Sequence, residues 1–196
     1  MKDLSGRILK YGLVLLVILF VLFSLYDGLF KGKDDYSMTM NAGHRYFEDG
    51  EYEKAIREFE SILQKDATTS PALFGVAIAR MQLGHFDEAL EKFTAAINLE
   101  KNSTNQAFYF ANRGILYDRM GLHHKALDDY KMALAQAPET ADGPGILSRI
   151  LHNQPEPPPT IADRARYLQA ELAKPEGERI LSVPEVDRQQ RTETVR

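Results

Sequence analysis

A spacing of glycine, alanine and aromatic residues recurs three times in the middle of this 196-residue chain. Each copy has a glycine, an alanine five residues later and an aromatic residue four residues after the alanine. The alanines are Ala55, Ala89 and Ala126, so the copies lie 34 and 37 residues apart. A period of this length is typical of a solenoid, in which each copy is one supersecondary unit.

Each copy predicts two helices that pack against each other. Gly50, Gly84 and Gly121 fall between the helices, where a left-handed backbone is favourable and glycine adopts it readily. The aromatic residues follow the alanines by one helical turn and fill the space between units. One helix pair cannot bury its apolar face alone, so we expect the three units to stack.

These motifs resemble the tetratricopeptide repeat, whose pattern contains Leu-Gly, Tyr, Ala-x-x-x-Phe and a closing Pro. Gly43 with Tyr46 matches the Gly-x-x-Tyr step of that pattern, and so does Gly114 with Tyr117. The resemblance assigns packing roles to Gly43, Tyr46, Ala55, Phe59, Ala77, Ala89, Phe93, Gly114, Tyr117, Ala126, Tyr130 and Pro138.

The resemblance implies an all-α fold with an α-solenoid at residues 36–152. Its parts are three helix pairs, at about 36–69, 70–103 and 107–140, and a capping helix at 144–152. The cap has its own support, because a proline at its start precedes apolar residues on one stripe. The remainder, 153–196, contains a Pro-rich spacer, a helix at 161–174 and a mobile tail. We expect that helix either to dock on the solenoid, as a cap or in its groove, or to be a loose linker.

A second feature precedes the repeats. Residues 8–30 form an apolar run of 23 residues in which only Lys10 and Asp27 are charged. As a helix this run is about 34 Å long, which exceeds the hydrocarbon core of about 30 Å. The sequence therefore predicts a single transmembrane helix after a short basic tail at 1–7. A cleaved signal peptide is the alternative, but no Ala-x-Ala-like pair of small residues follows the run.

The charges that flank the run predict its orientation. Three basic residues, Lys2, Arg7 and Lys10, lie before or near its start, and Lys31 and Lys33 follow it, which favours an N-terminus in the cytoplasm. The overall layout resembles bacterial inner-membrane repeat proteins, which would place the solenoid in the periplasm. A mitochondrial import-receptor-like protein has the same order of anchor and repeats.

Composition and motifs argue against several other functions. The net charge of −4 is unlike that of a general nucleic-acid binder. The absence of cysteine removes disulfides, thiolate metal sites and a cysteine nucleophile. His123, His124 and Asp128 are a weak candidate metal site, because only His124 and Asp128 share a helical face and two ligands are too few. We therefore expect no enzyme activity, no metal and no cofactor.

The resemblance also implies a concave groove, lined by the first helix of each unit, that takes an extended peptide or a partner helix. A groove rich in methionine and aromatic residues suits an apolar partner segment. Some of these side chains can instead belong to the core. The predicted groove residues are Met40, His44, Phe47, Phe74, Ile78, Met81, Phe108, Asn112, Ile115 and Arg119.

Members of this family that dock chaperone tails grip a carboxylate with Lys, Asn and Arg side chains. Asn112 and Arg113 match one such step. Met40 and His44, however, stand where a Lys and an Asn are needed. The sequence therefore does not predict docking of chaperone tails.

Together these features predict a membrane-anchored adaptor or scaffold that binds a protein partner during assembly of a membrane or envelope complex. One alternative is a structural membrane protein that self-associates as a homo-oligomer without a separate client. Another is a metal-dependent activity at His123, His124 and Asp128.

Overall fold

The computed structural model describes residues 2–138 and 160–182, apart from the side chains of residues 2–10, 13 and 26–34. These residues form helices, and no strand occurs among them. In chain order the helices are α1 (Lys2–Glu48), α2 (Tyr52–Lys65), α3 (Ser70–Gln82), α4 (Phe86–Leu99), α5 (Ser103–Arg119), α6 (His123–Gln136), α8 (Ile161–Leu172) and the short 3-10 helix η2 (Glu176–Glu178). The predicted cap at 144–152, the Pro-rich spacer and the tail beyond 182 lie outside the described residues.

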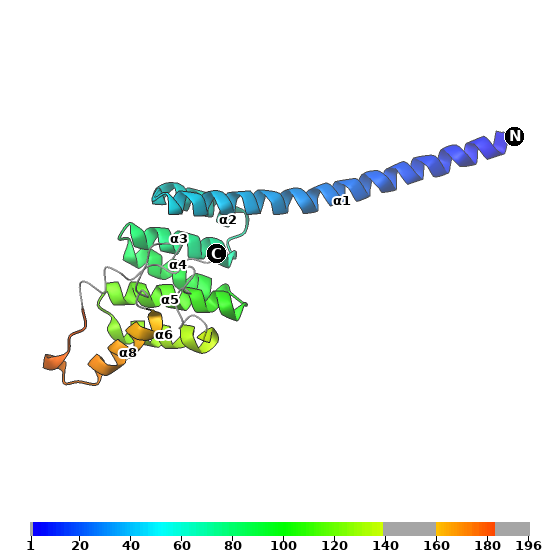
Figure 1. Ribbon diagram of the computed structural model, residues 1–196. Helices are drawn as coiled ribbons and strands as arrows, with labels where there is room; N and C mark the ends of the chain where they lie inside the picture. The colour runs from blue at the N-terminus through cyan, green and yellow to red at the C-terminus, as the bar shows by residue number, and fades with distance from the viewer. Residues whose placement is uncertain (1, 139–159, 183–196) are drawn as a thin grey trace, which may run out of the picture.

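The helices form antiparallel pairs that stack into an α-solenoid. The C-terminal part of α1 pairs with α2, α3 pairs with α4, and α5 pairs with α6. Successive pairs contact each other through α2 with α3 and α4 with α5 (Figure 1). The all-helical solenoid agrees with the fold that the repeat predicts.

Glycines end the first helix of each pair in the same way. Gly50, Gly84 and Gly121 have φ of 76°, 79° and 73°. At the first turn, the Glu51 N–H donates to the Tyr46 carbonyl at 2.8 Å and the Gly50 N–H to the Phe47 carbonyl at 3.1 Å. The same two hydrogen bonds recur at the other two turns. These bonds form a Schellman motif, which satisfies the last carbonyls of each helix and reverses the chain.

The aromatic rings of the repeat occupy spaces that small residues leave open. Phe59 on α2 is fully buried between Gly43 on α1 and Gly75 on α3. A Cβ atom at Gly43 would lie 2.5 Å from the Phe59 ring, and one at Gly75 would lie 2.7 Å from it. Tyr130 packs on Gly114 in the same manner, with 2.7 Å to an added Cβ. The spacing in the sequence therefore reflects contacts between helices.

The first helix is longer than the sequence predicts. Instead of one helix at 8–30 and another from about residue 36, the structure has the single helix α1. No proline precedes Pro71, so every peptide group of this stretch can join the helical hydrogen-bond ladder. The N-terminal part of α1 projects away from the solenoid (Figure 1). Among the side chains that the structure describes, no helix carries an apolar stretch long enough to cross a membrane.

The helix predicted at 161–174 is present as α8 and is docked. Thr160 and Asp163 form a capping box at its start, in which the Asp163 N–H donates to the Thr160 hydroxyl at 3.1 Å. Ile161, Ala165 and Leu168 are buried against α6. Of the expected arrangements, α8 therefore adopts that of a cap on the last described helix pair.

Candidate protein-binding surface

The structure buries most of the predicted groove residues. They lie on α1, α3 and α5, the first helices of the three pairs. The buried ones are Met40 (9% exposed), Phe74 (4%), Ile78 (1%), Met81 (1%), Asn112 (0%) and Ile115 (1%). His44, Phe47 and Phe108 are half-buried and Arg119 is exposed. The six buried residues do not line an open groove in this structure, which corrects the prediction, and their contact with a partner stays a prediction.

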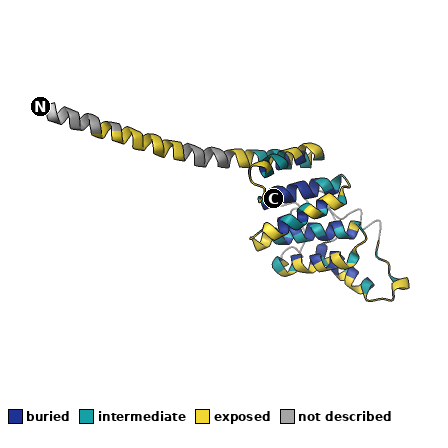
Figure 2. Cartoon of the chain, turned by 180° about the vertical axis from the view of Figure 1, so that it is seen from behind, coloured by how far each residue is buried: buried dark blue, intermediate teal, exposed yellow. Residues whose placement is uncertain are grey.

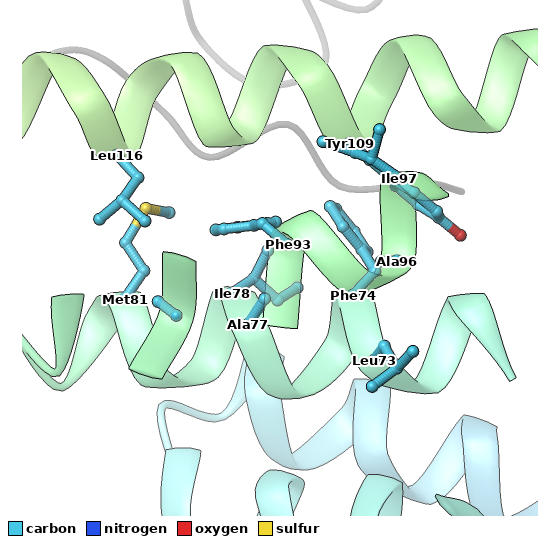
Figure 3. Packing of buried hydrophobic residues seen from close by; sticks show 11 residues of the cluster. Leu73, Phe74, Ala77, Ile78, Met81, Phe93, Ala96, Ile97, Tyr109 and Leu116 are labelled. Carbon is cyan, nitrogen blue, oxygen red and sulfur yellow. The ribbon is translucent and has the colours of Figure 1, made fainter. Parts of the chain in front are cut away.

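Large rings that face each other cover three of these residues, Phe74, Ile78 and Met81. The Phe74 ring stacks on the Tyr109 ring of α5, with centroids 4.5 Å apart and an angle of 20° between the planes. Its edge also meets Phe93 of α4 at 5.8 Å. Figure 3 shows these rings filling the space between the second and third helix pairs, with Ile78 and Met81 on the same helix face as Phe74. Side chains of this size close the space that smaller residues would leave open.

The remaining candidates form the accessible groove residues: His44, Phe47, Phe108 and Arg119. Phe47 and Phe108 pack at the margin of the same buried cluster, and each remains partly exposed. The His44 ring meets Phe59 edge-on at 5.5 Å. Burial lowers the pKa of His44, and the nearby Glu48 carboxylate opposes that shift only in part. These side chains offer apolar contact area with few fixed charges.

The partial carboxylate clamp is used inside the fold. The Asn112 side chain is fully buried, and its Nδ2 donates to the Phe108 carbonyl at 2.9 Å. The Arg113 guanidinium binds Asp129 through Nε at 2.7 Å and through a terminal nitrogen at 2.9 Å. Arg113 also donates to the Thr94 hydroxyl at 3.2 Å. Both side chains therefore make contacts within the solenoid. Asn112 and Arg113, which match the carboxylate clamp in sequence, stabilise the fold in this structure.

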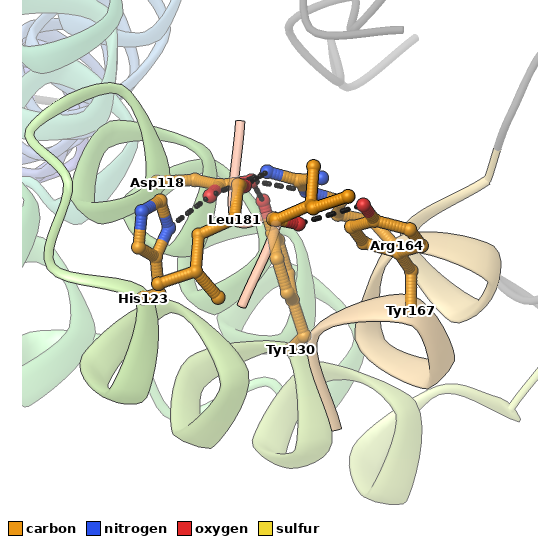
Figure 4. Close-up of polar contacts among 7 residues, drawn as sticks. Asp118, His123, Tyr130, Arg164, Tyr167 and Leu181 are labelled. Carbon is orange, nitrogen blue, oxygen red and sulfur yellow. Dashed lines mark hydrogen bonds and ion pairs between the residues drawn. The ribbon is translucent and has the colours of Figure 1, made fainter. Parts of the chain in front are cut away.

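A buried polar cluster around Asp118 joins α8 to the solenoid. Arg164 donates to the two carboxylate oxygens of Asp118 at 2.6 and 2.9 Å, and also to the Leu181 carbonyl at 2.9 Å (Figure 4). His123 Nδ1 lies 2.9 Å from the same carboxylate, and the Tyr130 hydroxyl lies 3.4 Å from it. Sequence reasoning missed this cluster. The available signal was Arg164 itself, which interrupts the apolar stripe of Ile161, Ala165 and Leu168.

The weak metal candidate does not form a site. His123 is engaged with Asp118, whereas His124 and Asp128 are exposed. No group of three His, Cys, Asp or Glu side chains suited to a metal ion occurs in the parts of the chain that the structure describes. The His123 ring contacts Asp118 of α5, and not the predicted co-ligands His124 and Asp128.

The stacked pairs and their glycine turns define a helical-repeat protein of the α-solenoid class. Residues 46–107 match the family described as the tetratricopeptide repeat, so this part of the chain is similar to that repeat. The match covers about a third of the chain and runs from the end of α1 into α5.

Two curated relatives match a shorter segment. The Photosystem I assembly protein Ycf3 of Synechococcus sp. (strain CC9605) is 36% identical over 55 residues, which are 28% of this chain and 32% of that protein. The protein of the same name from Prochlorococcus marinus is 38% identical over 56 residues, or 29% and 32% of the two chains. This chain thus spans about a third of the length of the curated relatives that it matches.

Solved structures share the fold. The first TPR domain of Spaghetti (RPAP3), bound to the HSP90 peptide SRMEEVD, has a TM-score of 0.55 at 18% identity and covers 72% of this chain and 95% of its own. The TPR2B domain of yeast Sti1, in a complex with pHsp70, has a TM-score of 0.52 at 15% identity, with coverage of 70% and 98%. At these identities the similarity concerns the fold alone.

Proposed function

We propose that this chain is a membrane-anchored adaptor that binds a protein partner during assembly of a membrane or envelope complex. The tetratricopeptide-like solenoid carries the proposal, since this architecture presents side chains for recognition and the described residues hold no metal-binding cluster. One structure of the same fold contains an HSP90 peptide and another is a complex with pHsp70, and the curated relatives are named as assembly proteins. We infer no enzymatic activity.

The anchor part of the proposal is supported by exposure on α1. Every large apolar side chain from Val14 to Leu25 is between 48% and 71% exposed (Figure 2). An α-helix that is apolar all round is unfavourable in water and suits either a protein interior or a bilayer. The sequence extends the apolar run to residues 8–30, which is long enough to span.

We propose the orientation from the charges alone. The three basic residues at the start of the run, against two after it, favour an N-terminus in the cytoplasm and a solenoid on the other side of the membrane. In a bacterial inner membrane this is the periplasm. Protease added to spheroplasts, which lack the outer membrane, should then cleave the solenoid. A solenoid that is protected from the protease would indicate the opposite orientation.

The proposed partner surface consists of the accessible groove residues. Replacing Phe74 or Met81 is a poor test, because truncating a buried side chain costs about 2–5 kcal/mol and perturbs the fold. Phe47 and Phe108 are better positions, because each is partly exposed at the margin of the same cluster. Exposed Lys131, on α6, provides a matched control position.

The test is site-specific photo-crosslinking in intact membranes. Benzoylphenylalanine introduced at position 47 or 108 should crosslink the full chain to the same partner protein, identified by mass spectrometry. The same group at position 131 should not capture it. Capture from position 131 alone would overturn the surface, and a product of twice the mass of the chain would favour the self-associating alternative.

A further inference from the structure

Two loops between helix pairs lie at the edge of the solenoid from which α1 departs. The loop from α2 to α3 contains residues 66–69, and the loop from α4 to α5 contains residues 100–102. Because the helices alternate in direction, the starts of α3 and α5 and the ends of α2 and α4 fall on one side. In Figure 1 the N-terminal part of α1 extends toward that same side. We define residues 65–70 and 100–103 as the near edge.

Contacts tie the first loop to α1. The Lys65 ammonium at the end of α2 pairs with the Asp35 carboxylate of α1. Thr39, one turn further along α1, donates its hydroxyl to the Asp35 carbonyl at 2.8 Å. These residues line an open hollow of about 500 Å³ together with Thr68, Thr69 and other residues of the loop. The Thr39 hydrogen bond lies within α1, so the contact between the first part of the near edge and α1 in this region is the exposed Lys65–Asp35 pair.

Contacts also tie the two loops to each other. The Ser70 hydroxyl donates to Glu100 Oε2 at 2.8 Å, and the Tyr109 hydroxyl donates to the same oxygen at 3.2 Å. The other oxygen of Glu100 accepts the N–H groups of Lys101 and Asn102, each at 2.9 Å. Burial raises the pKa of Glu100, but these hydrogen bonds outweigh it, so the carboxylate keeps a pKa below its ordinary value. The second loop therefore holds a fixed position beside the first.

The near edge lies a short distance along α1 from the apolar run. Asp35 is ten residues after Leu25, the last described apolar residue of the run, which is about 15 Å of helix. It is five residues after Phe30, the end of the proposed span, which is about 8 Å. Each headgroup layer of a bilayer is about 5–8 Å thick. Because α1 is continuous, this distance is set by a rigid element.

We propose that the near edge is the surface that the solenoid presents to phospholipid headgroups, an inference that rests on the proposed membrane anchor. Asp66 and Glu100 keep their negative charges, but both carboxylates already accept hydrogen bonds within the loops, from Thr68 and from the N–H groups of Lys101 and Asn102. Exposed Lys101 and the hydroxyl of exposed Ser103 are donors at this edge. The glycine turns lie at the opposite edge and face away from the bilayer in this arrangement.

The chain contains no cysteine, so single-cysteine variants report on one position each. Ala67→Cys and Ser103→Cys place a fluorophore at the near edge, whereas Asp49→Cys and His124→Cys place it at the opposite edge. All four positions are exposed. The two edges are separated by the length of α3, whose 13 residues span about 20 Å. The full chain is reconstituted in vesicles of phosphatidylethanolamine and phosphatidylglycerol that carry a headgroup spin label as quencher.

We expect the labels at positions 67 and 103 to be quenched at least about twofold more than those at 49 and 124, because only the former lie near the headgroup layer. Flotation of each variant with the vesicles is measured in parallel. Equal quenching at both edges in protein that floats would overturn the near edge but leave the anchor intact. Failure of all variants and of the unmodified chain to float would instead overturn the anchor, and the near edge with it.

Discussion

At the scale of single residues, the Phe59 ring shows how the repeat holds neighbouring helix pairs together. The ring contacts two glycines that lie on different helices, Gly43 and Gly75. Close packing of this kind tolerates neither a larger neighbour nor a smaller ring. The consequence can be tested at Gly75, which lies between two units.

Gly75→Ala should destabilise the solenoid by about 1–3 kcal/mol, because overpacking a filled core forces neighbours to shift. The added Cβ would lie 2.7 Å from Phe59 ring atoms that have no free space to move into. Thermal and urea unfolding measure the effect. Gly177→Ala is the control, since an added Cβ there meets no atom within 4 Å. Equal stability of the two variants would contradict this account of the ring.

His44 should make stability depend on pH. Burial lowers its pKa below the ordinary value of 6.5, so the unfolded chain binds a proton at a pH where the folded chain resists it. The free energy of unfolding therefore has its full value above the pKa of His44 in the unfolded chain. It decreases as the pH falls from that pKa toward the lower pKa of the folded chain. Urea unfolding at about pH 7.5 and about pH 5.5 should show a larger loss for the unmodified chain than for His44→Gln. The comparison isolates His44 from the other histidines, and identical losses would contradict the prediction.

At the scale of elements, α8 is held by both apolar and ionic contacts. Leu168 is fully buried in the cluster with Tyr130 of α6. The side chains of Arg164 and Asp118 are only 4% and 3% exposed, so their pair is desolvated. In such a pair the loss of one partner is costly, because a buried charge remains uncompensated.

Arg164→Ala should therefore release α8, with a loss of about 3–5 kcal/mol in docking free energy. Hydrogen exchange at the amides of α8 should accelerate, while exchange in α3 and α4 should change little. Arg166→Ala is a matched control on the same helix, because Arg166 is 78% exposed in its pair with Asp163. Such surface pairs contribute about 0–1 kcal/mol. Unchanged protection of α8 in Arg164→Ala would show that the apolar contacts alone suffice.

The elements differ in how far the sequence could predict them. The glycine turns and the alanine–aromatic spacing follow from local rules, and the structure has both in place. Contacts between distant residues could not be predicted in this way. Phe74 is buried by Tyr109 from the next unit, and Asp118 meets Arg164 from a helix 46 residues away. The burial of six predicted groove residues could not be foreseen, because periodicity shows which face of a helix a residue occupies but not what covers that face.

At the scale of the whole molecule, α1 combines a part that packs in the solenoid and an exposed apolar part in one helix. Its C-terminal part packs on α2, whereas the described apolar side chains nearer the N-terminus are exposed. The sequence predicted these two functions but divided them between separate helices, because charged residues at 31–35 interrupt the apolar pattern without breaking a helix. If the exposed run is an anchor, changes there should alter membrane attachment and leave the solenoid folded.

The triple variant Leu16→Arg, Leu19→Arg and Leu22→Arg should lose membrane attachment. An arginine near the centre of a span costs about 2.5–3.5 kcal/mol, so three cost about 9 kcal/mol, whereas the remaining Leu, Ile, Val and Phe residues of the run supply about 4–8 kcal/mol at about 0.3–0.6 each. Membrane flotation after alkaline extraction measures attachment, and circular dichroism checks that helicity persists. The control replaces the same three leucines with alanine, which keeps the run uncharged and should still float. Flotation of the arginine variant to the same extent as the control would show that residues 8–30 do not anchor the chain, whereas its selective loss would separate anchoring from folding in a single experiment.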